Sequence, residues 1–141
     1  MTKIKKSVVI NLTVMCWYKI FPKERFIAVA YIGVTSSQDI KALSEKIWID
    51  PDYDQYFDAI IDYSNAKLDL TPDEIEEIAA FFLANRNTLK GKIAKIVMTP
   101  MEAALVSLLC SAAASQVHIA LFSTWQAAAE YVGTTVALPD V

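Results

Sequence analysis

The sequence has few of the residues that build catalytic and metal sites. Its 141 residues include one histidine, His118, two cysteines, Cys16 and Cys110, and only three glycines. The cysteines lack the paired spacing of zinc ligands, and the scattered glycines cannot form a phosphate-binding loop. His118 lies in an apolar run, with no marked nucleophile and orienting partner around it. We therefore expect no catalytic residues, no metal ligands and no cofactor, and predict that the protein is not an enzyme.

An excess of positive charge and a membrane-spanning run are also missing. The formal net charge is -3, and the only basic cluster, Lys3, Lys5 and Lys6, is typical of a solvated chain start. A general nucleic-acid binder would present a basic face. The longest apolar run, Met101–Ala114, is shorter than the roughly 20 residues that cross a bilayer. No signal-peptide cleavage site follows the early apolar residues. We expect a cytoplasmic protein with no nucleic-acid partner and no membrane span.

Hydrophobic residues make up 55% of the chain, which favours one folded domain over disorder. The first elements are predicted to be two strands, Val14–Phe21 and Arg25–Ile32. The polar turn Pro22–Glu24 is short enough to join them as an antiparallel hairpin. Gly33 is expected to end the second strand.

The rest of the chain alternates helix and strand patterns. Ser36 or Ser37 is expected to cap a helix that ends near Trp48. Each of three further helices is predicted from a hydroxyl residue followed, three places on, by an acid or amide. These pairs are Thr71 with Glu74, Thr99 with Glu102, and Ser123 with Gln126, and their helices are expected to end near Gly91, Ser115 and Gly133. Strands are predicted within Tyr56–Tyr63, Lys92–Met98 and Val117–Phe122.

The resulting order, β-β-α-β-α-β-α-β-α, predicts an α/β fold with a mixed, mostly parallel five-stranded sheet and about four helices. Residues 14–133 are expected to form the domain, between an N-terminal extension, 1–13, and a C-terminal tail, 134–141. The strand that starts at Ile93 is apolar except at Lys95, as in a sheet covered on both faces.

The segment from Pro51 to Gly133 resembles the STAS-like domains of bacterial anti-sigma-factor antagonists, and more closely their uncharacterised bacterial relatives. The resemblance depends on an ordered set of short motifs, and the preceding hairpin and helix fit the same topology. The motifs are Phe57-Asp58-Ala59-Ile60-Ile61-Asp62, Leu68-Asp69-Leu70-Thr71-Pro72-Asp73-Glu74-Ile75, Gly91-Lys92-Ile93-Ala94-Lys95-Ile96-Val97 and Leu121-Phe122-Ser123-Thr124-Trp125-Gln126-Ala127-Ala128.

The resemblance implies a STAS-like fold, a regulatory protein partner and a candidate phosphoacceptor. In the antagonists a partner kinase phosphorylates the serine of an Asp-Ser-x-Gly motif. Thr71 falls on that position and keeps a hydroxyl, but Leu70 replaces the aspartate and Asp73 the glycine. From the residues alone, Thr71 also has a structural explanation as a helix cap.

Two further surfaces are candidates for binding. The helix Met101–Ser115 has no charge after Glu102, so we expect a partner to cover its outer face, formed by Ala103, Ser107, Ser111 and Ser115. Leu105, Leu108, Leu109 and Ala112 are expected to face the core. The cover could be a second copy of the chain, the segment Ser7–Leu12 or a bound apolar ligand.

The other candidate is a pocket at the carboxyl ends of the strands, where ligands bind open parallel sheets. It would bring together Asp62, Tyr63, Ser64, Thr99 and Ser123, with Met98 and Phe122 beside them. The expected function is a non-catalytic regulatory or protein-binding module, acting as a homodimer. The alternative is a carrier of a small apolar or lipid-like ligand, as in the related CRAL-TRIO-type fold.

Overall fold

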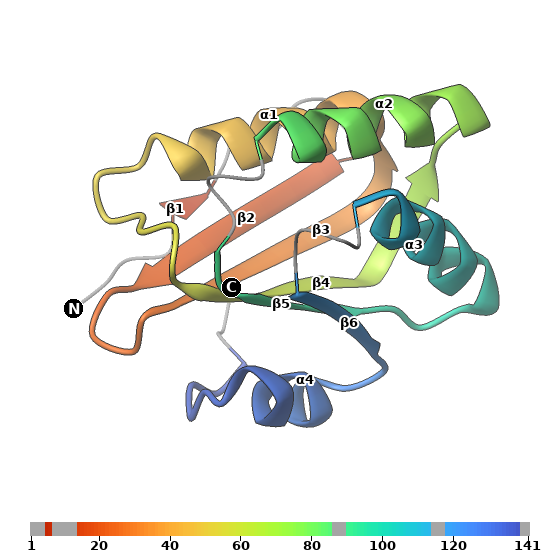
Figure 1. The fold of residues 1–141 in the computed structure, drawn as a ribbon. Helices are drawn as coiled ribbons and strands as arrows, with labels where there is room; N and C mark the ends of the chain where they lie inside the picture. Colours follow the sequence, from red (N-terminus) through yellow and green to blue (C-terminus); the bar gives the residue numbers. More distant parts are fainter. Residues whose placement is uncertain (1–4, 7–13, 86–89, 114–117, 139–141) are drawn as a thin grey trace.

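In the computed structural model the described residues, 5–6, 14–85, 90–113 and 118–138, form six strands and four helices (Figure 1). Helices and strands alternate after an N-terminal group of strands, as the sequence predicts. In chain order the elements are β1 (Lys5–Lys6), β2 (Val14–Phe21), β3 (Phe26–Ser36), α1 (Ser37–Trp48), β4 (Asp58–Asp69), α2 (Pro72–Ala84), β5 (Lys92–Ile96), α3 (Pro100–Ala113), β6 (His118–Phe122) and α4 (Trp125–Val132).

The sheet has the order β1-β2-β3-β4-β5-β6. The β2–β3 hairpin is antiparallel, and β3 to β6 are parallel neighbours. This confirms the mixed, mostly parallel sheet of five strands with four helices. The sixth strand, β1, is only two residues long, and Lys5 and Lys6 pair with Tyr18 and Trp17 at the edge. Those two lysines are therefore not a simple solvated chain start.

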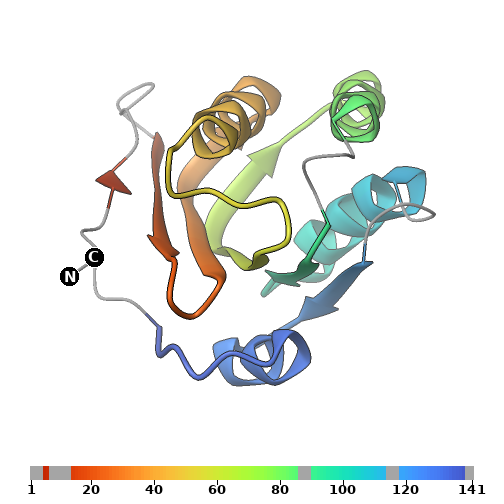
Figure 2. The ribbon, with the colours of Figure 1, turned by 60° about the vertical axis from the view of Figure 1, so that its left-hand side comes forward.

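Helices cover the two faces of the sheet unequally. α1, α2 and α3 lie on one face and α4 lies alone on the other (Figures 1 and 2). Right-handed crossovers between strands that advance in one direction place their helices on the same side. The core therefore has two clusters, one between the sheet and the three helices, and one between the sheet and α4. Ile78 and Ile60 are fully buried members of the first and second cluster respectively.

β3 and β4 are longer than the sequence predicts. Gly33 does not end β3; it has φ 80° within the strand, which continues to Ser36. β4 runs to Asp69 because it keeps parallel pairing with β3 past an irregularity in register between Ala30 and Ile32. The polar run after Tyr63 hides this second half of β4 from a pattern search.

The helix starts agree with the sequence at three of four positions. Ser36 caps α1, Thr71 caps α2, and the Thr99 hydroxyl accepts a hydrogen bond from the Glu102 amide at the start of α3. The cap of α4 is Thr124, not Ser123, because the Thr124 hydroxyl accepts from the Ala127 amide. Ser123 and Thr124 are adjacent hydroxyl residues, and either could cap a helix, so an error of one residue in the predicted helix start is expected.

Helix and strand ends differ by a few residues from their predicted places. α2 ends at Ala84, not near Gly91, and β5 ends at Ile96. α4 ends at Val132 and is capped by Gly133, which has φ 77°, as predicted. The expected domain limits, 14 and 133, stay a prediction, and contacts cross both of them. β1 pairs with β2, and the Trp125 indole donates to the Val136 carbonyl.

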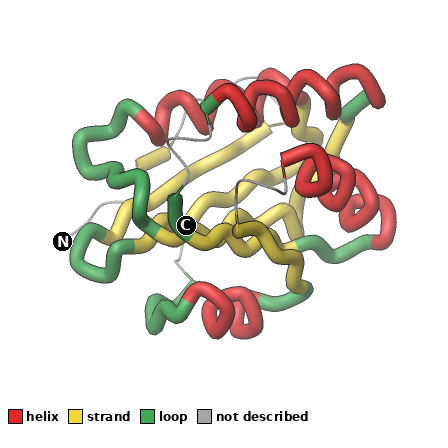
Figure 3. The backbone as a smooth tube through the Cα atoms, viewed as in Figure 1, coloured by secondary structure: helices red, strands yellow, loops and turns green. Residues whose placement is uncertain are grey.

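Figure 3 shows how little of the described backbone lies outside helices and strands. Among the connections that are described throughout, the longest without regular structure is the loop 49–57, between α1 and β4. Among the described residues, none of the helices has the length and apolar character needed to cross a membrane.

Candidate ligand-binding site

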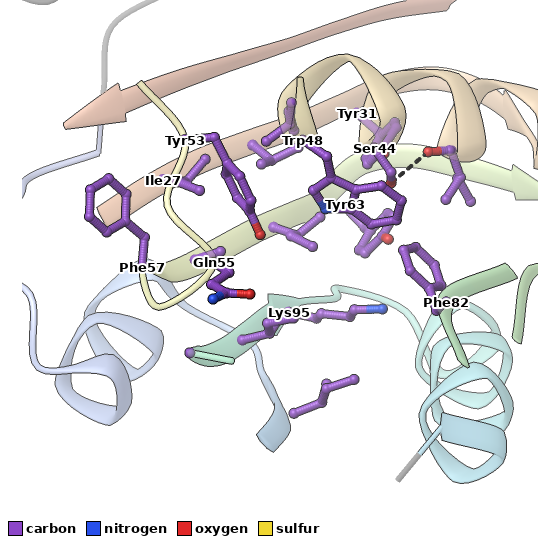
Figure 4. A pocket seen from close by; sticks show the side chains of 18 residues that line it. Ile27, Tyr31, Ser44, Trp48, Tyr53, Gln55, Phe57, Tyr63, Phe82 and Lys95 are labelled. Carbon is purple, nitrogen blue, oxygen red and sulfur yellow. Dashed lines mark hydrogen bonds between the residues drawn. The ribbon is translucent and has the colours of Figure 1, made fainter. Parts of the chain in front are cut away.

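A cavity of about 80 Å³ lies between the sheet and the three-helix side of the fold (Figure 4). Side chains of four parallel strands form its floor, and α1, α2 and the loop 49–57 form its walls. The lining is mainly apolar and aromatic. It consists of Ile27, Val29, Tyr31, Ile40, Ser44, Ile47, Trp48, Tyr53, Gln55, Phe57, Ala59, Ile61, Tyr63, Phe82, Gly91, Ile93, Lys95 and Ile119.

Strand register explains which side chains face this space. Ala59 pairs with Ile93, and Ile61 pairs with Lys95 one step further along the strands. Alternate residues of a strand point to opposite faces, so Ile93 and Lys95 face the cavity while Ala94, between them, is buried in the α4 cluster. The small Ala59 side chain leaves room in the floor.

The loop 49–57 closes one end of the cavity. Tyr53 and Gln55 extend from this loop toward the cavity (Figure 4), and Phe57 also belongs to its lining. The loop is tied to the start of β5, because the Lys90 amide donates to the Gln55 carbonyl at 2.8 Å. The Lys92 amide also donates to Asp58 Oδ1 at 2.8 Å. These bonds fix the cavity wall against the sheet.

Lys95 brings the one cationic side chain into the lining. It is only 5% exposed. Its ammonium lies 5.9 Å from the centroid of the Tyr63 ring and 5.8 Å from that of Phe82. Figure 4 shows the lysine reaching along the cavity toward Phe82. No carboxylate of the described residues lies within ion-pairing distance of this ammonium, so the aromatic faces are its main electrostatic partners there.

Aromatic hydroxyls give the cavity wall a limited polar character. The Tyr31 and Tyr63 rings are stacked, with their centroids 5.2 Å apart. The nearby Ser44 hydroxyl donates a hydrogen bond to the Ile40 carbonyl at 2.8 Å. Burial raises the pKa of Tyr31 well above its usual value, and the neighbouring Tyr63 raises it further. Burial, with a smaller effect of Asp54, raises the pKa of Tyr53 to about 12. These phenols therefore stay protonated at neutral pH.

The described residues do not assemble a recognisable catalytic or metal centre. No three histidine, cysteine or acidic side chains gather closely enough to hold a metal ion in the part of the chain that is described. His118 is exposed at the first position of β6 and is not buried in the strand. Cys16 is buried in the core, and the side chain of Cys110 lies outside the described residues.

The pocket predicted at the strand ends is not one site. Asp62, Tyr63 and Ser64 lie in the middle of β4, which continues to Asp69. Tyr63 lines the cavity, whereas the Asp62 carboxylate accepts a hydrogen bond from the Ser64 amide at 2.8 Å. Thr99 and Ser123 instead border a shallow groove beyond β5 and β6. The extra length of β4 separates the two sets.

Met98 and Phe122 lie beside Thr99 and Ser123 in that groove, as the sequence predicts for the ends of adjacent parallel strands. Met98 is 60% exposed. The groove is open and shallow, with no buried polar side chain in its lining. It therefore has the character of a contact surface more than of a small-molecule site.

Thr71 lies exposed at the start of α2. Its hydroxyl accepts from the Glu74 amide at 3.2 Å, and its own amide donates to Glu74 Oε1 at 3.0 Å. The second oxygen of Glu74 accepts from the Ser37 hydroxyl at 2.9 Å. The hydroxyl of Thr71 therefore has the capping role that the sequence predicts. The Glu74 carboxylate lies next to this hydroxyl at the candidate phosphorylation site.

The faces of α3 are oriented differently from the prediction. Val106 and Glu102 are buried, whereas Leu108, which was expected in the core, is 56% exposed. Ala103, expected on the outer face, packs partly against the core, and Ser107 is exposed. The reason is Glu102, whose carboxylate accepts from the Leu68 amide of β4 and so turns its face inward. The side chains of Ser111, Leu109 and Ala112, and all of Ser115, lie outside the described residues.

The feature that sequence reasoning missed is the cavity with Lys95. The sequence does mark this lysine as the single charged residue inside a central, apolar strand. A charge at the middle of a strand covered on both faces is costly unless something compensates it. That contradiction is the signal that could have located the site.

Comparison with known proteins supports the fold and goes no further. No family model matches the chain, and no curated protein matches it. Among solved structures, it is similar to an uncharacterised protein of the DUF3478 family with a SpoIIAA-like fold from Shewanella loihica PV-4. The TM-score is 0.53 at 11% identity, and the match covers 94% of this chain and 95% of that chain. The chain therefore has the SpoIIAA-like, or STAS-like, fold that its sequence motifs predict.

Proposed function

We propose that this protein is a non-catalytic, cytoplasmic binding module that holds a small, largely apolar ligand between its sheet and helices α1 and α2. The observation that carries this proposal is the cavity lined by Ile27, Ala59, Ile61 and Ile93 together with aromatic rings. Enclosed, mainly apolar spaces with a few polar groups are the usual form of small-molecule sites. The proposal favours the carrier function over the purely regulatory one.

The size of the space limits the occupant. The cavity measures about 80 Å³, well below the ~150 Å³ of an engineered cavity that binds benzene. The size therefore favours a short aliphatic body over an aromatic ring or a long acyl chain.

Native mass spectrometry of the protein as purified tests the proposal. We expect a retained small molecule, and a rise in melting temperature when small apolar compounds are added. Replacing Ala59 by leucine fills the floor of the cavity, so A59L should lose both effects while keeping its circular dichroism spectrum.

Ala80 provides the matched control. It is exposed on α2, so A80L adds the same atoms outside the cavity and should keep both effects. The proposal fails if the wild-type protein carries nothing and no apolar compound shifts its melting temperature. It also fails if A59L and A80L behave alike.

A second function, protein binding through α3, is favoured by exposed apolar residues. Met101 is 69% exposed and Leu108 is 56% exposed. They are seven residues apart and therefore share one helix face. Contiguous exposed apolar surface is typical of protein–protein contacts. We propose that this face pairs with a second copy of the chain or with a regulatory partner, with Ser107 beside it.

Thr71 stays a candidate phosphoacceptor within this second function. Its exposure makes the hydroxyl accessible to a kinase. A phosphate would add about two negative charges at the start of α2, where the helix dipole attracts anions. It would also displace the Glu74 cap and meet the carboxylates of Asp73 and Glu74, so we propose that its effect would be to loosen this helix end.

A further inference from the structure

Lys95 is an unusual residue for the floor of an apolar cavity. Its neighbours in the adjacent strands at the same level are Ile61 and Leu121. Phe82 of α2 and Tyr63 of β4 face its ammonium. The residue as a whole is buried, but its Nζ is not among the fully buried, unpaired polar atoms of the described residues, so the ammonium is accessible from the cavity. Among the described residues, none supplies a carboxylate to this ammonium.

The aromatic rings satisfy only part of what the ammonium can bind. A cation over an aromatic face gains a weak electrostatic attraction, whereas an ammonium has three N–H donors that rings do not satisfy as an oxygen anion does. Both ring centroids lie near the outer limit of about 6 Å for a useful contact. The side chain is thus held by its rings and is available to an anion entering the cavity.

From this geometry we infer that the ligand is an amphipathic monocarboxylate, with its carboxylate on Lys95 and its apolar body over Ala59 and Ile93. This inference rests on the proposed function, because it names the chemical class of the ligand in the same cavity. The lining has one cationic side chain, Lys95, which can pair with one carboxylate head group. Apart from Ser44 and Gln55, the remaining lining is apolar or aromatic, which matches a short hydrocarbon body.

Butanoate and butanamide are suitable probes because they have the same number of heavy atoms, differ in charge and have a short apolar body. Nuclear magnetic resonance titrations of the full chain at constant ionic strength would measure both dissociation constants. We expect the wild-type protein to bind butanoate about tenfold more tightly than butanamide, because a charge-assisted hydrogen bond is stronger than a neutral one. Replacing Lys95 by methionine should remove this preference while keeping butanamide binding, because methionine preserves the apolar contacts.

Lys92 offers a control on the same strand. Its ammonium lies over the Tyr131 ring of α4 and contacts the Tyr131 carbonyl at 3.4 Å, so it faces away from the cavity. K92M removes the same charge and should keep the tenfold preference. K95M should keep the wild-type circular dichroism spectrum, since methionine preserves the apolar contacts of the buried lysine stem.

The possible failures are distinguishable. If both probes bind the wild-type protein equally, or if K95M keeps the preference for butanoate, the assignment of a carboxylate to Lys95 is wrong while the cavity remains a ligand site. If neither probe binds and no other apolar compound shifts the melting temperature, both the assignment and the proposed function are wrong.

Discussion

Gly91 shows how a single residue shapes the cavity. It lines the space at the point where the chain enters β5. A Cβ atom built on Gly91 would overlap the carbonyl of Phe57, with the carbonyl carbon only 2.7 Å away. The backbone of the loop 49–57 therefore packs directly against Gly91. Any larger residue would push this wall of the cavity outward.

We expect Gly91→Ala to destabilise the protein by about 1–3 kcal/mol, because the backbone atoms of Phe57 cannot move aside as a flexible side chain can. Urea unfolding would measure the loss. The variant should also weaken binding of apolar compounds, since Phe57 belongs to the cavity lining.

Gly133→Ala is the comparison. Gly133 has φ 77° but nothing within 4 Å of an added Cβ, so its replacement costs only the backbone strain, about 1 kcal/mol. It should leave ligand binding unchanged. An equal effect of both variants on binding would contradict the role given to Gly91.

The start of α2 has a complete capping box. Thr71 and Glu74 exchange hydrogen bonds, and Ser37 of α1 donates to the same Glu74 carboxylate. The contact joins two neighbouring helices at their N-terminal ends. Hydrogen bonds from the Thr71 amide, and then from Ser37, lower the pKa of Glu74 below its ordinary value of 4.5.

This shift predicts how the stability of α2 depends on pH. A lowered pKa in the folded state means that Glu74 stabilises the protein above about pH 4.5 and loses this effect as the pH falls through its folded pKa. The urea midpoint of the wild-type protein should exceed that of Glu74→Gln at neutral pH. The difference should shrink as the pH falls below 4.5 and the carboxylate becomes protonated.

Glu76→Gln is the control for removal of one negative charge, because Glu76 is exposed on the same helix. It should not reproduce this pH-dependent difference. A gap between the wild-type protein and E74Q that stays constant from neutral to acidic pH would rule out the ionised cap.

At the scale of the whole molecule, periodic patterns predict the elements because they depend on local physics. Hydroxyl caps at Thr71 and Thr99 and the αL stop at Gly133 are set by neighbours within a few residues. The order of strands then follows from right-handed crossovers. What the sequence does not predict is the continuation of β4 past Tyr63, because pairing with β3 overrides a polar composition there.

The candidate site shows the same limit. The cavity depends on three arrangements of residues that are far apart in the sequence. The loop 49–57 packs against Gly91, the small Ala59 lies in the floor between neighbouring strands, and Phe82 lies over Lys95. None of these can be inferred from spacing along the chain. Likewise, the inward turn of Glu102 toward Leu68 is a contact across 34 positions, and it decides which face of α3 is exposed.

That exposed face leads to the last prediction, on oligomeric state. A homodimer through α3 would bury Met101 and Leu108 against the same residues of a second copy, since a two-fold interface uses one patch twice. Light scattering after gel filtration should give twice the monomer mass for the wild-type protein. Replacing both residues by glutamate places charges at the contact and should give the monomer mass.

Leu138→Glu is the matched control, because Leu138 is 54% exposed in the C-terminal segment, away from α3. It adds an acid at an exposed leucine and should leave the dimer intact. A wild-type protein that remains monomeric at high micromolar concentration would exclude self-association. The apolar face of α3 would then have to serve a different protein, because the ligand cavity lies over the strands covered by α1 and α2 and does not include Met101 or Leu108.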